Sequence, residues 1–86
     1  MNLEDLRTKI DVTDKQLIRL ISRRMKLVAK IGVFKKDKGD KILDLKREEE
    51  VLNSVKKTAN RAGININMVL KIWKILIREA KKNQNE

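Results

Sequence analysis

Residues 3–36, LEDLRTKIDVTDKQLIRLISRRMKLVAKIGVFKK, decide the fold because their inward positions recur alternately every four and every three residues. A heptad seam of this kind is typical of a helix that pairs with another helix along its length. We therefore predict one continuous helix over residues 3–36. The seam comprises Leu6, Ile10, Thr13, Leu17, Leu20, Arg24, Leu27, Ile31 and Phe34.

The rest of the chain also has helical periodicity. It contains no proline and no alternating β pattern. After a polar connection at about 37–42, we expect a second helix at about 43–61, with Gly63 as its C-terminal cap. A third helix is expected at about 65–83, with Asn65 as its N-cap. The fold class predicted is all-α, with one long and two shorter helices.

The length of the first helix predicts a homodimer. About 34 helical residues span roughly 50 Å, at 1.5 Å a residue. A compact globule of 86 residues has a diameter of about 30 Å. A single domain over residues 1–86 therefore cannot cover the seam, and two chains are expected to intertwine along it. The alternative is a monomer whose first helix is bent or broken at Gly32.

Composition restricts the classes of function. The chain has 22 Lys and Arg against 12 Asp and Glu, a net charge of +10, and neither His nor Cys. We therefore expect an anionic ligand and no metal or other cofactor. A helical nucleic-acid-binding protein is an alternative, but the basic residues are dispersed and the two aromatic residues, Phe34 and Trp73, lie at apolar helix positions. No apolar run approaches a membrane span, so we expect a cytoplasmic protein without a membrane partner.

Charged residues interrupt the apolar face of the first helix. Arg24 lies on the seam, where an unpaired guanidinium would be costly to bury and requires an anion. Lys35 follows eleven residues later on the same face, about 16 Å along the helix. Two cations so spaced suggest a small dianionic ligand. The alternative is that Arg24 pairs with a carboxylate such as Glu48, or extends to the edge of the core.

The second helix places further charges inward. Asp44, Arg47 and Glu48 share one face through their spacings of three and four residues. Asp44 is explained by itself as an N-cap, whereas Glu48 lies one turn inside the helix and faces the core. Arg7 would by itself be a surface charge, because it is about 25 Å from Arg24 along the helix. In an antiparallel helix pair, however, Arg7 of the partner subunit would approach Arg24.

Together these motifs resemble the all-helical chorismate mutases. The resemblance extends without gaps from Leu6 to Gln84. It implies an intertwined homodimer with two equivalent sites, which rearranges chorismate to prephenate without a cofactor. The motifs that carry it are Arg7 in LRTKID, Arg24 in SRRMKLVAKIG, Lys35 in FKK, DLKRE from Asp44 to Glu48, and Gln84.

The resemblance also implies a role for each residue. Arg24 would bind one substrate carboxylate and Arg7 of the partner subunit another. Lys35 and Gln84 would donate hydrogen bonds to the ether oxygen of the breaking bond. The ring hydroxyl would donate to Glu48, supported by Arg47 and the backbone of Asp44. Ala80 stands where the family often has Ser, so one carboxylate contact would be weaker. The apolar walls expected to exclude water are Val28, Ile31, Val51, Val55 and Ile77.

Two alternatives share this scaffold. One is a lyase that eliminates pyruvate from isochorismate, whose pocket would need nearly the same groups. The other is a purely structural helical dimer. That second alternative leaves the inward charges of Arg24, Lys35 and Glu48 together without an explanation.

Overall fold

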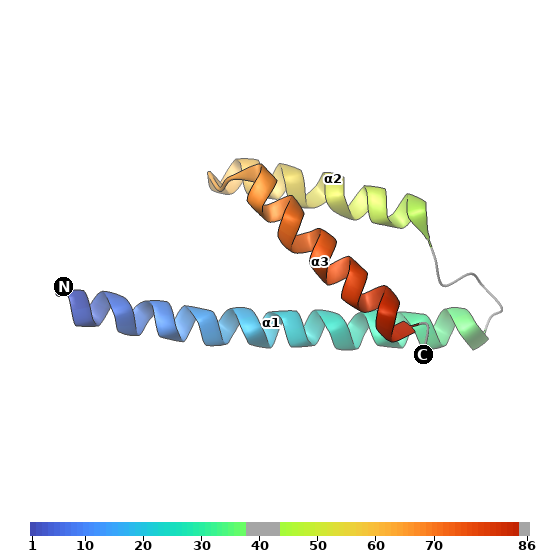
Figure 1. Cartoon of the computed structure of the whole chain (residues 1–86), viewed down its shortest axis with the longest axis horizontal. Helices are drawn as coiled ribbons and strands as arrows, with labels where there is room; N and C mark the ends of the chain where they lie inside the picture. Colours follow the sequence, from blue (N-terminus) through green and yellow to red (C-terminus); the bar gives the residue numbers. More distant parts are fainter. Residues whose placement is uncertain (38–43, 85–86) are drawn as a thin grey trace.

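The structure is a computed structural model that describes residues 1–37 and 44–84, with the backbone alone described at 36, 37, 83 and 84. Three helices and no strand are present in these ranges (Figure 1). The helices are α1 (Leu3–Asp37), α2 (Leu45–Ala62) and α3 (Ile66–Gln84). The all-helical class with one long and two shorter helices is thus confirmed. Nearly all of the connection expected at 37–42 lies outside the described residues.

Local sequence signals mark where α2 and α3 begin and where α2 ends. The Asp44 side chain accepts a hydrogen bond from the backbone N–H of Arg47 at 2.9 Å and caps α2. Asn65 caps α3 in the same way, accepting from the N–H of Met68 at 2.9 Å. Gly63 ends α2 in the left-handed region at φ 71°, where glycine carries no Cβ penalty. The N–H groups of Gly63 and Ile64 then satisfy two of the last carbonyls of α2, as in a Schellman motif.

Helix α3 joins the other two helices into one unit. It packs against α2 and crosses the C-terminal half of α1, whereas the described parts of α1 and α2 make no close backbone approach (Figure 1). Helix α1 continues through Gly32, so the alternative of a helix broken there is wrong. The molecule extends 55 × 23 × 16 Å, and its radius of gyration of 16.0 Å exceeds the ~12 Å of a compact chain of this length.

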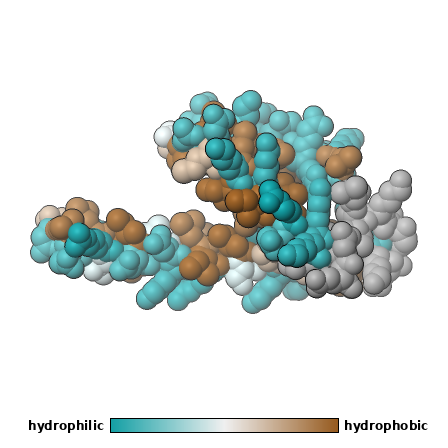
Figure 2. All heavy atoms as spheres, in the orientation of Figure 1, coloured by the Kyte–Doolittle hydropathy of each residue, from teal (hydrophilic) through white to brown (hydrophobic). Residues whose placement is uncertain are grey.

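The seam of α1 is uncovered. Every residue from 1 to 23 is exposed, and the apolar seam residues from Leu6 to Phe34 leave between 48% and 61% of their surface accessible. Apolar side chains accordingly follow the protruding part of α1 at the surface (Figure 2). Within the described ranges, the buried hydrophobic residues are Ala59, Val69 and Ala80. Such a core is small for a helix that carries so much apolar surface.

None of the described helices combines the length and the low charge needed to cross a membrane.

Candidate active site

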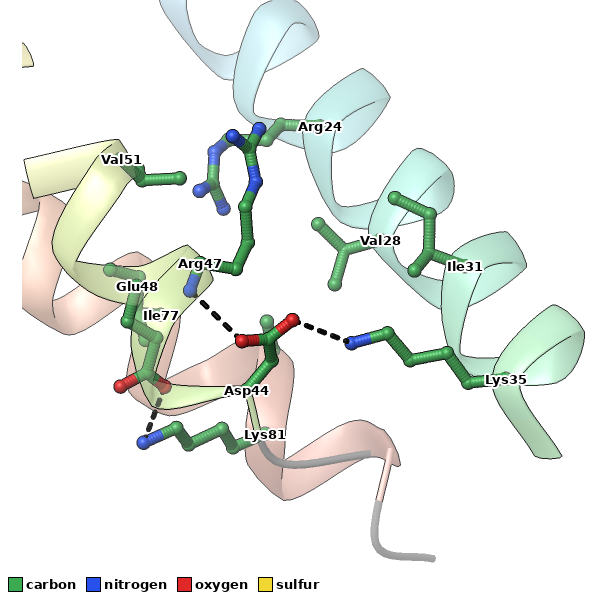
Figure 3. A pocket seen from close by; sticks show the side chains of 11 residues that line it. Arg24, Val28, Ile31, Lys35, Asp44, Arg47, Glu48, Val51, Ile77 and Lys81 are labelled. Carbon is green, nitrogen blue, oxygen red and sulfur yellow. Dashed lines mark hydrogen bonds and ion pairs between the residues drawn. The ribbon is translucent and has the colours of Figure 1, made fainter. Parts of the chain in front are cut away.

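A cavity of about 160 Å³ lies where the C-terminal half of α1, the first turns of α2 and the last turns of α3 meet (Figure 3). Four of its side chains are cationic and two are anionic, so the lining carries an excess of two positive charges. The rest of the wall is apolar. The lining residues are Arg24, Val28, Ile31, Lys35, Asp44, Arg47, Glu48, Val51, Ile77, Ala80 and Lys81.

The structure brings together six of the eight residues proposed from the sequence for this site. Four of the five expected apolar residues also line the cavity, and Val55, further along α2, does not. The six that meet are Arg24, Lys35, Asp44, Arg47, Glu48 and Ala80.

Arg24 is the least satisfied charged group in the cavity. Its Nη1 is buried and has no hydrogen-bond partner. Burial and the nearby guanidinium of Arg47 both lower the pKa of Arg24, and burial has the larger effect. Within the part of the chain that the structure describes, no carboxylate pairs with Arg24. The side chains of Arg24 and Arg47 lie close together in Figure 3, an arrangement that suits the binding of a carboxylate.

The alternative pairing of Arg24 with Glu48 is wrong. Oε1 of Glu48 forms an ion pair instead with the ammonium group of Lys81 on α3 (Figure 3). Glu48 lines the cavity one turn inside α2, as its sequence position predicts. Its partner comes from α3 and not, as in the alternative, from α1.

Lys35 and Asp44 face each other across the cavity. The Nζ of Lys35 lies 3.8 Å from Oδ2 of Asp44, while Oδ1 of the same carboxylate caps α2. Asp44 is thus both an N-cap and a cavity residue. A distance of 3.8 Å is longer than an ammonium–carboxylate hydrogen bond of about 2.8 Å, so the donors of Lys35 remain available to a ligand.

Arg7 does not reach the cavity of its own chain. Its side chain is 62% exposed, and its Nη1 lies 3.1 Å from Oε1 of Glu4 in an ion pair within the first turns of α1. Gln84 ends α3, and its side chain lies outside the described residues. Ala80 is buried in the wall but offers no hydrogen-bond donor from its side chain.

Lys81 lines the cavity but is not among the site residues predicted from the sequence. The sequence does contain a signal, because Lys81 follows Ile77 by four positions and so shares its face of the helix. A lysine near the end of a helix is ordinarily assigned to solvent, where it also interacts favourably with the helix dipole.

Fold and site together define an all-helical protein whose pocket carries a net positive charge and so suits an anionic ligand. The charged and apolar groups that line the pocket suit the binding, orientation and charge stabilisation of an anionic ligand.

The chain belongs to the chorismate mutase type II family, which it matches over residues 6–85. It is 33% identical over 84 residues to the T-protein of Haemophilus influenzae, and the aligned region covers 98% of this chain and 22% of that protein. It is 30% identical over 84 residues to the chorismate mutase of Methanocaldococcus jannaschii, covering 98% of this chain and 85% of the relative. The chain thus spans about a fifth of the length of the T-protein but most of the archaeal enzyme.

Proposed function

We propose that the pocket binds chorismate and converts it to prephenate, as an isomerase of aromatic amino-acid biosynthesis. The observation that carries the proposal is the buried, unpartnered Nη1 of Arg24 beside a second guanidinium. Chorismate carries two carboxylates, which matches the excess of two positive charges in the lining. Membership of the chorismate mutase type II family supports the same substrate.

The reaction requires only groups of the kind that line this pocket. The ether C–O bond of chorismate breaks while a new C–C bond forms within the same molecule, in one cyclic shift of six electrons. No proton, hydride or group leaves the substrate. The protein must hold the enolpyruvyl side chain over the ring and stabilise the negative charge that grows on the ether oxygen.

Arg24 and Lys35 are assigned the two central roles. The planar fork of Arg24 suits bidentate binding of a carboxylate. Lys35 would turn its ammonium from Asp44 to the ether oxygen, where one fixed donor is typically worth about 3–4 kcal/mol of transition-state stabilisation. The surrounding Val28, Ile31 and Val51 reduce access of water and so strengthen both interactions.

The end of the pocket that carries Glu48 and Asp44 is assigned to binding the ring hydroxyl of chorismate. Glu48 would accept its hydrogen bond, with Arg47 and the backbone of Asp44 beside it. Gln84 would donate to the ether oxygen together with Lys35. Since Ala80 has no hydroxyl, we expect weaker binding of one carboxylate rather than loss of activity.

The functional unit proposed is an intertwined homodimer. Its support is the uncovered apolar seam of α1, which a second copy would bury. In this arrangement Arg7 of the partner subunit would bind the second carboxylate. The proposal includes a cytoplasmic location and no nucleic-acid or membrane partner.

The test is to follow chorismate by its ultraviolet absorbance and to identify the product. Saturable formation of prephenate is expected, with no requirement for an added metal. A parallel assay with isochorismate separates the lyase alternative, since elimination would release pyruvate. A folded protein that turned over neither substrate would contradict the proposal.

A further inference from the structure

Among the described cations that line the pocket, Lys81 is the one to which the family resemblance assigns no role. It comes from α3, and its ammonium pairs with Oε1 of Glu48 on α2. The side chains of Lys81 and Glu48 are 37% and 23% exposed, so the pair lies at the wall of the cavity and not in open solvent. Lys82, the next residue, is exposed and does not line the cavity.

The local structure explains why Lys81 points inward. Ala80 is buried against the neighbouring helices, and Ile77, one turn earlier, lines the same cavity. The stem of Lys81 can therefore lie along apolar surface while its ammonium reaches Glu48 (Figure 3).

Lys81 is the cation that pairs with Glu48, because the other described cations of the pocket pair elsewhere or form no ion pair. From α1, Lys35 pairs with Asp44, and Arg24 forms no ion pair with a described carboxylate. On α2 itself, the Nη1 of Arg47 lies 3.6 Å from Oε2 of Glu50. In the described ranges, the ion pair of Glu48 is therefore the one with Lys81 of α3.

We infer that Lys81 is a positioning residue, which holds the Glu48 carboxylate at the end of the pocket that receives the substrate hydroxyl. This inference rests on the proposed function, in which Glu48 accepts that hydrogen bond. Without Lys81, the carboxylate would rotate freely and would be drawn toward the unpaired guanidinium of Arg24. It would then compete with the substrate carboxylate for the same donor.

The experiment compares Lys81→Met with Lys82→Met, its exposed neighbour of identical chemistry. The hydrogen bond from the substrate hydroxyl to Glu48 forms in the bound substrate and in the transition state alike. Its loss is therefore expected mainly to raise KM. We expect Lys81→Met to raise KM for chorismate about tenfold, the effect of one hydrogen bond to a charged group, with kcat changed much less. Lys82→Met should match the parent, and Lys81→Arg should recover most of the loss.

A double variant separates positioning from direct contact. If Lys81 acts through Glu48, then Lys81→Met adds little to the defect of Glu48→Gln. Full additivity of the two effects would overturn the inference, because Lys81 would then touch the substrate itself. Equal KM values for Lys81→Met and Lys82→Met would overturn it as well.

Two controls keep the outcomes distinct. Circular dichroism reports whether Lys81→Met retains its helices, and Lys81→Gln replaces it in the comparison if it does not. If the parent chain itself does not convert chorismate, the proposed function fails. If the parent is active and KM is insensitive to Lys81, this inference alone fails.

Discussion

Two adjacent faces of α1 are built from similar apolar residues but differ in what covers them. The pocket face, which includes Val28, Gly32 and Lys35, is at least partly covered by α2 and α3 of the same chain. The seam face, which includes Leu17 and Leu27, stays about half exposed, and no described part of the chain covers these two leucines.

Arg24 lies where these two faces meet. It belongs to the heptad seam by its spacing and to the pocket by its contacts. The pocket is therefore formed within one chain, whereas the apolar seam would be covered only by the second copy that we propose. A second copy that covered the seam would also close the pocket on the side of Arg24.

The largest expected effect comes from breaking the seam. In the proposed homodimer Leu17 of each copy would be buried, which is worth about 3–6 kcal/mol for two copies. We therefore expect Leu17→Glu to convert that dimer to monomer. Sedimentation velocity over a range of concentrations measures this. Gln16→Glu adds the same charge one residue away from the seam and should leave the dimer intact. Equal association of both variants and the parent would show that the seam is not the interface.

Breaking the pocket face should leave assembly unchanged and reduce turnover. Lys35→Ala removes the donor assigned to the ether oxygen, and we expect kcat to fall about 10²–10³-fold. Helicity and dimer formation should persist, because the ion pair of Lys35 with Asp44 is partly solvated and contributes little to stability. Turnover near that of the parent would exclude Lys35 from the mechanism.

A mixing experiment tests whether the two faces form one site. Arg7→Ala and Arg24→Ala chains should each be inactive as homodimers. Every mixed dimer would contain one intact site, so random mixing should recover about a quarter of the parent activity. No recovery, with mixed dimers shown to form, would contradict a site shared between subunits.

The smallest expected effect is a loss of thermal stability on substitution of Gly63, which ends α2. Gly63→Ala meets no atom within 4 Å, so its cost is that of a left-handed alanine, about 1 kcal/mol. We expect Tm to fall by about 4–8 °C, measured by circular dichroism, with kcat per folded site unchanged. An unchanged Tm would show that the strain at this cap is relieved elsewhere.

The sequence predicted what depends on local patterns. The long helix followed from the seam, and Asp44, Gly63 and Asn65 cap the helices as their residue types predict. Arg24 stood out because a charge replaced an aliphatic residue in a regular pattern. Each of these signals lies within one helix turn or one repeat.

What the sequence left open depends on contacts between helices. Lys81 has the same local surroundings as many solvent lysines, and only the packing of α3 against α2 brings it to Glu48. Likewise, periodicity could not choose between Glu48 and a ligand as the partner of Arg24. The position of Arg7 relative to the pocket depends on a second chain and remains a prediction.

The most direct test of the account compares two adjacent arginines. Arg24 lines the pocket with a buried, unpartnered nitrogen, whereas Arg23 is exposed and lies outside it. Chorismate turnover should be measured for Arg24→Ala and Arg23→Ala, with helicity checked for both. We predict that Arg24→Ala loses at least about 100-fold in kcat/KM, as expected for a buried charge-assisted contact, while Arg23→Ala keeps the parent value. Equal turnover in the two variants would contradict the assignment of this pocket as the active site.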